Sequence, residues 1–374
     1  MTKRIMLSTP HMSDEGYEME YIHDAFRKNW IAPLGENVNE FEKVMGGFMG
    51  AGYPVALSAG TAALHLAMIL AGVKAGDKVF CQSLTFAASC NPVRYVGAEP
   101  IFIDSDYETW NMDPNALERA FEIYGKPAAV VVVHLYGGCA RMDKILAICN
   151  KFGVPLIEDA AEALGSEYHG TKCGTFGKYG ILSFNGNKII TTSGGGMLLC
   201  EEEADAKHAL KLATQAREPF PWYQHEEIGY NYRMSNIVAG IGRGQMKVLD
   251  LRIRQKRAIY ERYAANLAGL PLVFQPEMDG TKSNRWLTSI LLEPNCGITP
   301  IQLLDALDAA NIEGRPLWKP MHVQPVFAKN AYVTAGEKSV SDDLFERGLC
   351  LPSDTKMTME DVDRVCDVIW KVFA

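Results

Sequence analysis

Short apolar runs alternate with amphipathic stretches between residue 53 and residue 200. The apolar runs predict strands and the amphipathic stretches predict helices. Such alternation is typical of a mostly parallel sheet with helices on both faces. The wholly apolar run at 129–133 agrees, because a strand covered on both faces has no polar side. The predicted strands are Pro54–Leu57, Lys78–Cys81, Pro100–Ile103, Ala128–His134, Val154–Glu158, Ile181–Phe184 and Gly196–Cys200, and the predicted helices are Thr61–Ala71, Phe86–Val96, Pro114–Phe121 and Met142–Phe152.

The pattern differs on either side of this region. Two helices are predicted before it, Glu15–Arg27 and Asn37–Met49, with a loop at 30–35 between them. After it, one long helix is predicted from Asn236 to Leu267. The remainder reads as a strand at Trp286–Leu292 and helices at Thr299–Ala310 and Thr358–Phe373. We therefore expect an α/β protein with a large seven-stranded sheet domain at 1–250 and a smaller α+β domain at 251–374.

Composition and charge narrow the class of protein. The chain has 374 residues and a net charge of −8, without a basic stripe, which argues against nucleic acid as a partner. Its nine cysteines include no Cys-x-x-Cys pair, so we expect free thiols in a reducing cytoplasm and no bound metal ion. No stretch approaches the roughly 18 apolar residues of a membrane helix, and the N-terminus lacks the apolar region of a signal peptide.

A candidate anion site follows the first predicted strand. The strand leads into Ser58-Ala59-Gly60-Thr61, which opens a helix. Small residues let backbone N–H groups approach an anion, and a helix N-terminus favours negative charge. Gly60 and Thr61 are the candidate contacts, although an ordinary strand-to-helix turn explains the same residues. The Gly-x-Gly-x-x-Gly pattern of dinucleotide-binding enzymes is absent at this turn.

The most informative pair in the sequence is Asp159 and Lys188. Asp159 ends an apolar run, and Lys188 follows 29 positions later between a polar turn and a glycine run. A lysine that forms a Schiff base and a carboxylate that faces a ring nitrogen are the minimum apparatus for pyridoxal phosphate (PLP) chemistry. Taken singly, the lysine reads as a solvated side chain and the aspartate as a helix N-cap.

Three further residues fit the same interpretation. Glu162 either reaches the ring hydroxyl of the cofactor or forms a capping box with Asp159. Phe86 follows a strand and either stacks on the ring or packs in the core. Ser183 lies five residues before Lys188 and could give its hydroxyl to the phosphate. Lys188 itself would move the proton between the substrate carbon and the cofactor.

Four motifs in order resemble one family, the DegT/DnrJ/EryC1/StrS nucleotide-sugar aminotransferases. They are the segments at 58–64, 158–165, 183–188 and 229–234. The resemblance implies a fold-type-I PLP-dependent transferase similar to aspartate aminotransferase. It also implies that Lys188 carries the cofactor, Asp159 pairs with the pyridinium, Gly60, Thr61 and Ser183 bind the phosphate, and Phe86 stacks on the ring. Many members have Gln or His where this chain has Glu162.

The resemblance has consequences for assembly as well. Asn231 would reach the cofactor phosphate in the other subunit, which implies a homodimer with shared active sites. Lys188 also separates the chain from sister sugar 3-dehydratases, which have histidine at that position.

Within the family, the segments at 185–197, 214–218, 283–287 and 315–322 resemble the transaminases of bacillosamine synthesis. This implies a UDP-linked 4-keto-6-deoxy sugar with an N-acetyl group at C2 as acceptor and L-glutamate as donor. The product would enter bacterial glycan or glycoprotein synthesis. Alternatives are a dTDP- or GDP-linked sugar, amination at C3, or a regulatory protein that keeps PLP without turnover.

Candidate substrate contacts follow from that substrate. A pyrophosphate needs cationic donors, although each arginine on its own also reads as a surface ion pair. The candidates for this charge are Arg217, Arg233, Arg285 and Arg315. Trp318 and His322 share a loop with Arg315, Trp30 and Ile31 would meet the 6-methyl group, and Asn187 would bind a sugar hydroxyl or the acetyl group, or hold the turn.

Overall fold

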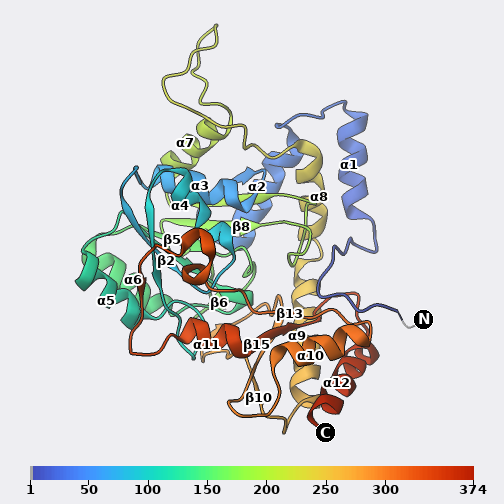
Figure 1. Cartoon of the computed structure of the whole chain (residues 1–374). Coiled ribbons are helices and arrows are strands. Elements are labelled where there is room, and N and C mark those ends of the chain that lie inside the picture. The colour runs from blue at the N-terminus through green and yellow to red at the C-terminus, as the bar shows by residue number, and fades with distance from the viewer. Residues whose placement is uncertain (1–2) are drawn as a thin grey trace.

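The computed structural model describes residues 3–374 and centres on a mixed sheet of eight strands (Figure 1). The order across the sheet is β1-β9-β8-β5-β4-β2-β3-β14. Seven of these strands run in one direction and β9 runs in the opposite one, so the sheet is mostly parallel. The bounds are β1 Tyr53–Leu57, β2 Lys78–Gln82, β3 Glu99–Ile103, β4 Ala129–Val133, β5 Leu156–Asp159, β8 Tyr179–Ser183, β9 Gly196–Cys200 and β14 Tyr332–Val333.

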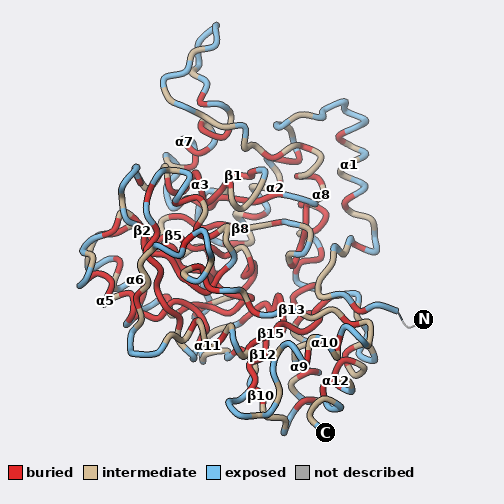
Figure 2. The backbone as a smooth tube through the Cα atoms, viewed as in Figure 1, coloured by how far each residue is buried: buried red, intermediate tan, exposed pale blue. Residues whose placement is uncertain are grey.

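Two hydrophobic clusters cover the two faces of the sheet, because successive strand residues point to opposite sides. In β4, Val130 and Val132 join one cluster while Ala129 and Val131 join the other. The first cluster packs under helices α2 (Glu36–Met49), α5 (Pro114–Tyr124) and α6 (Met142–Phe152). The second packs under α3 (Gly60–Leu70), α4 (Asn91–Tyr95) and α7 (Glu203–Ala213). Figure 2 shows the buried strands between these layers.

The C-terminal part of the chain forms a second, smaller core. Its four-stranded antiparallel sheet has the order β10-β12-β15-β13. The helices α9 (Leu249–Asn266), α10 (Pro300–Ala309) and α12 (Met359–Phe373) pack with it, and Ile5 of the N-terminal segment joins the same cluster. The strands are β10 Leu272–Phe274, β12 Thr288–Leu292, β13 Arg315–Pro316 and β15 Gly348–Leu351.

The predicted fold class is confirmed, with several differences in detail. The sheet has eight strands and not seven, because β14 pairs with β3 although its two residues are too few to show a periodic pattern. The long helix expected at 236–267 is two helices, α8 (Asn236–Met246) and α9. The helix expected at 86–96 begins only at Asn91, after a short 3-10 turn. Its Pro92 lies in the first turn, where a missing N–H is tolerated.

Several elements have no counterpart among the predicted ones. They are α7, α11 (Val340–Arg347), β10, β13, β14, β15 and a small three-stranded sheet of β6 (Glu167–Tyr168), β7 (Thr171–Lys172) and β11 (Thr281–Lys282). The division of the chain near residue 250 stays a prediction. Segments from the two sides of residue 250 lie in the same sheets, since β14 belongs to the large sheet and β11 pairs with β6.

One segment projects from the body of the molecule. Residues 214–232, between α7 and α8, form the arm that extends beyond α7 in Figure 1. Four large apolar side chains are exposed on it: Phe220, Trp222, Tyr223 and Ile228. Among residues 3–374, none of the helices combines the length and apolar character needed to cross a bilayer.

Glu158 fixes the loop that leads into β8. Its side chain is fully buried and accepts hydrogen bonds from the backbone N–H groups of Gly174 (2.8 Å), Phe176 (2.6 Å) and Gly177 (2.6 Å). The ring of His134 lies 2.9 Å from the same carboxylate. Since β8 begins two residues after Gly177, this carboxylate sets where the strand that leads to Lys188 starts.

We therefore predict that Glu158→Ala destabilises the protein strongly. The buried N–H of Gly174 and the partly buried N–H groups of Phe176 and Gly177 would lose their acceptor. Each unsatisfied group costs about 1–3 kcal/mol when buried, so the total loss is on the order of 3 kcal/mol. Urea unfolding followed by circular dichroism measures it. Glu118→Ala, which removes a solvent-exposed ion pair with Lys151, serves as the control and should change stability by less than about 1 kcal/mol. Equal losses in the free energy of unfolding of the two variants would contradict this role of Glu158.

Candidate functional site

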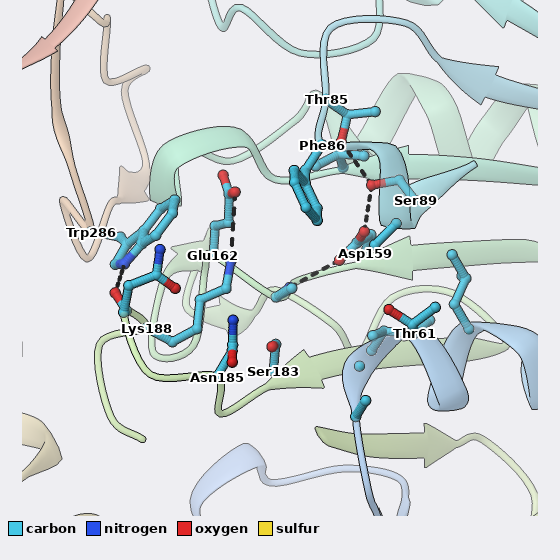
Figure 3. A pocket seen from close by; sticks show the side chains of 18 of the residues that line it. Thr61, Thr85, Phe86, Ser89, Asp159, Glu162, Ser183, Asn185, Lys188 and Trp286 are labelled. Atoms are coloured by element: carbon cyan, nitrogen blue, oxygen red, sulfur yellow. Dashed lines mark hydrogen bonds and ion pairs between the residues drawn. The ribbon is translucent and has the colours of Figure 1, made fainter. Parts of the chain in front are cut away.

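A cavity of about 320 Å³ opens where the carboxyl ends of β4, β5 and β8 meet the start of α3 (Figure 3). In doubly covered parallel sheets this edge is where ligands bind. Val133, Asp159 and Ser183, the last residues of the three strands, all line it. Side chains from far along the chain complete the wall, among them Trp286 and Trp318.

Asp159 is held rigidly at the floor of this cavity. It is 8 % exposed, and its Oδ2 accepts a hydrogen bond of 2.6 Å from the Ser89 hydroxyl. Ser89 in turn contacts the Thr85 hydroxyl at 2.7 Å, and the backbone N–H of Ala161 donates to the other carboxylate oxygen at 3.1 Å. These bonds fix the direction of the carboxylate while its cavity-facing side stays available for a protonated ring nitrogen.

The first turn of α3 forms a cradle for an anion. Its N-cap residue is Ala59, whose side chain cannot accept from the exposed N–H groups of the helix. A β-carbon at position 60 would lie 3.2 Å from the β-carbon of Ser183, so glycine keeps the space open. A β-carbon at position 196 would collide with the backbone of Ala59 and Gly60, which explains the glycine at the start of β9. The uncapped helix end and the adjacent Thr61 and Ser183 hydroxyls suit a phosphate.

Lys188 reaches into the same cavity from the loop after β8. Its Nζ lies 3.6 Å from Glu162 Oε1 and 4.2 Å from the centre of the Trp286 ring. The peptide before it is held in place, because the Trp286 indole N–H donates to the carbonyl oxygen of Asn187 at 2.8 Å. Figure 3 shows the lysine between Trp286, Glu162 and Asn185.

Glu162 is a buried carboxylate with a defined orientation. Its Oε2 accepts a 2.7 Å hydrogen bond from the backbone N–H of Tyr136, while Oε1 faces Lys188. Burial raises the pKa of the Glu162 carboxyl, and the nearby Lys188 charge offsets this only in part. The Tyr136 contact shows that Glu162 does not close a capping box on Asp159.

These residues fit PLP. The uncapped start of α3 with Gly60 suits the phosphate, the Asp159 carboxylate suits the pyridinium, and the Lys188 amine suits the aldehyde. When bound, PLP supplies an electron sink that stabilises negative charge at the substrate carbon. The chain supplies the orientation: Ser89 aligns Asp159, and the Glu162 carboxylate lies where it can hold or release a proton beside the Lys188 amine.

Nine of the residues predicted from the sequence line this one cavity. They are Gly60, Thr61, Phe86, Asp159, Glu162, Ser183, Asn187, Lys188 and Trp318. The Phe86 ring is half exposed, projects into the cavity and lies 5.1 Å from the ring of Trp318.

Three other predicted residues do not line this cavity. Arg233 is buried in an ion pair with Glu42, and Arg285 is buried against Gln275 and Glu277. The His322 ring stacks on Tyr332 and contacts Ser83 and Asp342.

The remaining predicted residues are on the surface. Arg217 and Asn231 lie on the projecting arm, and Arg217 stacks on Tyr223. Trp30 and Ile31 are exposed in the loop before α2. Arg315 pairs with Glu313 and borders a second cavity.

Sequence reasoning missed Thr85, Ser89 and Trp286. Thr85 and Ser89 flank Phe86 in the sequence, so a search for hydroxyls beside that aromatic residue could have found them. The contact between Trp286 and Asn187 joins positions 99 residues apart, and no local pattern carries that information.

The fold and the cavity define a fold-type-I PLP-dependent enzyme. The chain belongs to the DegT/DnrJ/EryC1/StrS aminotransferase family, whose sequence profile matches residues 13–370. It is 52 % identical to EpsN of Bacillus subtilis (strain 168), named as a pyridoxal phosphate-dependent aminotransferase, over 100 % of this chain and 97 % of that protein. It is 35 % identical to the GDP-perosamine synthase of Caulobacter vibrioides, over 97 % of this chain and 96 % of that protein.

A solved structure agrees with this assignment. The structure of DesI in the presence of its TDP-sugar product matches this one with a TM-score of 0.91. The two sequences are 25 % identical, and the match covers 100 % of this chain and 94 % of DesI. The protein is therefore a PLP-dependent sugar aminotransferase.

The raised pKa of Glu162 leads to a stability prediction for the cofactor-free protein. Because the folded state holds this proton more tightly than the unfolded chain, ionised Glu162 destabilises the fold once the pH exceeds the raised pKa. Glu162→Gln should therefore raise the melting temperature at pH 8 and change it little at pH 4, where both states are protonated. Melting curves at the two pH values measure this, and an equal gain at both would contradict it.

Proposed function

We propose that this protein transfers an amino group from L-glutamate to C4 of a nucleotide-linked keto sugar. The acceptor proposed is UDP-2-acetamido-2,6-dideoxy-4-keto-hexose, and the product would serve bacterial glycan or glycoprotein synthesis. The observation that carries the proposal is the Lys188 amine in one cavity with the Asp159 carboxylate and the uncapped start of α3. Sequence segments that resemble the bacillosamine transaminases support the UDP-linked acceptor.

In this proposal the residues of the cavity divide the work. Lys188 carries the cofactor and moves the proton at the substrate carbon, while Glu162, 3.6 Å away, balances the charge of its amine. Asp159 keeps a positive charge on the ring nitrogen. Gly60, Thr61 and Ser183 bind the phosphate, and Phe86 covers one face of the ring.

A second cavity, of about 620 Å³, could take the nucleotide. It shares Asn187, Trp286 and Trp318 with the first cavity, so the two adjoin across one wall. Arg315 and Lys319 line it and are exposed at their side-chain ends, where a pyrophosphate could reach them. Aromatic side chains in the same wall suit contact with a base or sugar. We therefore propose that the sugar lies over the cofactor and the nucleotide lies in the second cavity.

One observation favours a second candidate, a GDP-linked keto sugar. Three relatives at 34–36 % identity carry the name GDP-perosamine synthase, from Caulobacter vibrioides, Vibrio cholerae and Escherichia coli O157:H7. The same cavity residues would serve either nucleotide, because a pyrophosphate is common to both.

We also propose a homodimer with shared active sites in the cytoplasm. The projecting arm supports the dimer, because its exposed Trp222, Tyr223 and Ile228 form an apolar surface that a partner subunit would cover. Asn231 and Arg217 lie on this arm and would meet the partner's site. The cysteines, all free, are consistent with a reducing compartment.

Turnover with a panel of acceptors tests the proposal. The holoenzyme is incubated with L-glutamate and 4-keto sugars linked to UDP, GDP or dTDP, and mass spectrometry follows the amino sugar and 2-oxoglutarate. We expect the highest kcat/KM with the UDP-linked N-acetyl sugar. Higher kcat/KM with the GDP-linked sugar would favour the second candidate. Absence of any product, or a Lys188→Ala variant as active as the wild type, would overturn the proposal.

Removal of the Arg315 charge should weaken acceptor binding. Arg315→Ala is expected to raise KM for the sugar nucleotide about five- to tenfold with little change in kcat, because a pyrophosphate contact is made equally in ground and transition states. Steady-state kinetics measures both constants. Arg262→Ala removes an ion pair with Asp363 on the smaller core and is the matched control, with KM unchanged. A fall in kcat at constant KM would contradict this role.

A further inference from the structure

An N-terminal strap, residues 5–13, ties the smaller core to the loop that carries Lys188. On the smaller core, the backbone N–H of Glu313 donates to Ile5 O at 2.9 Å, and that of Ser353 donates to Leu7 O at 2.7 Å. The Thr9 N–H donates to Asp354 Oδ2 at 3.0 Å. The strap therefore has a fixed position relative to the residues that follow β15.

The Ser8 side chain of the strap is hydrogen-bonded to the loop after β8 that carries Lys188. Its hydroxyl lies 3.1 Å from the carbonyl oxygen of Asn187, to which it donates, and Asn187 immediately precedes Lys188. The Trp286 indole donates to the same carbonyl oxygen. Two donors from different parts of the chain thus hold the peptide that enters Lys188.

Ser8 is itself held by Lys256 of α9. The Lys256 amine lies 3.1 Å from the Ser8 hydroxyl oxygen and 2.5 Å from the carbonyl oxygen of Ser353. Lys256 is 2 % exposed, so its amine depends on these acceptors for its hydrogen bonds. A continuous path therefore runs from Lys256 through Ser8 to the Asn187 carbonyl.

We propose that Lys256 and Ser8 are positioning residues that set the Lys188 loop according to the protonation of Lys256. This inference rests on the proposed role of Lys188 as the residue that carries the cofactor, and it does not depend on which sugar is aminated.

The reason is the single proton of the Ser8 hydroxyl. A charged ammonium has no lone pair, so it can only donate to Ser8, and Ser8 then directs its own proton to the Asn187 carbonyl. A neutral amine does have a lone pair, which competes with that carbonyl for the serine proton. Deprotonation of Lys256, with release of the proton to solvent, therefore weakens one of the two bonds that hold the Asn187 peptide.

The surroundings of Lys256 bring this change into the neutral range. Burial lowers the pKa of Lys256 to about 7, against the opposing effect of the Asp354 carboxylate. The charged or titratable groups nearby are Asp354 and Lys356 after β15, His11 on the strap and Arg252 one turn earlier on α9, with Lys188 beyond Asn187. We call the path from Lys256 through Ser8 to the Asn187 carbonyl the relay. Its bond from Ser8 to Asn187 is thus fully formed below about pH 7 and weakens as the pH rises through that value.

The test follows the absorbance and the release of PLP from the holoenzyme between about pH 5.5 and about pH 9, without any sugar nucleotide. The wild type should show a step near pH 7, with faster release above it. In Ser8→Ala and Lys256→Met that step should be lost. In Ser8→Ala, release at pH 6 should also be roughly fivefold faster, as expected for one hydrogen bond. In Lys256→Met the Ser8 hydroxyl still donates to the Asn187 carbonyl, so release should stay slow across the whole pH range. Ser8→Thr keeps the hydroxyl and should keep the step.

Thr355→Val is the matched control. It removes the 2.8 Å contact between Thr355 and His11 on the same strap and leaves the relay intact, so the step should remain. A step that persists in Ser8→Ala, or that disappears equally in Thr355→Val, would overturn the relay while the proposed function stands. If Lys256→Met does not fold, the Ser8 variants decide the outcome. A wild type without cofactor absorbance would instead defeat the proposed function.

Discussion

The end of β5 places two carboxylates next to each other, and the rest of the site depends on their pointing to opposite sides. Glu158 points to one side of the sheet and accepts hydrogen bonds from three backbone N–H groups of the loop before β8. Asp159 points to the other side and faces the cavity. One strand end thereby fixes both the acid proposed to meet the ring nitrogen and the start of the strand that leads to the lysine. A shift of register by one residue would exchange the two carboxylates.

On the cavity wall, the largely buried side chains of Glu162 and Lys188 lie 3.6 Å apart. Glu162 is buried beside Lys188, and burial holds the pKa of its carboxyl above its usual value. The Lys188 charge acts on the same carboxyl in the opposite direction, so the two groups are linked electrostatically. The Trp286 ring beside the amine adds a favourable contact to the cation without adding a second anion.

The sequence was most informative where local pattern and chemistry coincide. Asp159 and Ser183 end buried strands and Gly60 opens a helix, so strand prediction alone brings them to one edge of the sheet. Contacts across the chain could not be predicted in this way. Arg233 shows why: nothing near it in the sequence reveals that its partner is Glu42, 191 residues earlier in the chain. The strand β14 was missed because two residues carry no periodicity.

Trp286 stands between the two cavities, with its ring over the Lys188 amine and its edge bonded to the Asn187 carbonyl. A small molecule built to span both spaces would have to pass this indole or displace it. Displacement would remove the indole N–H bond to the Asn187 carbonyl, so a molecule bound in one cavity would change the position of Lys188 in the other. Inhibitors confined to the outer space would leave the indole in place and could exploit residues such as Phe345, which the inner cavity does not contain.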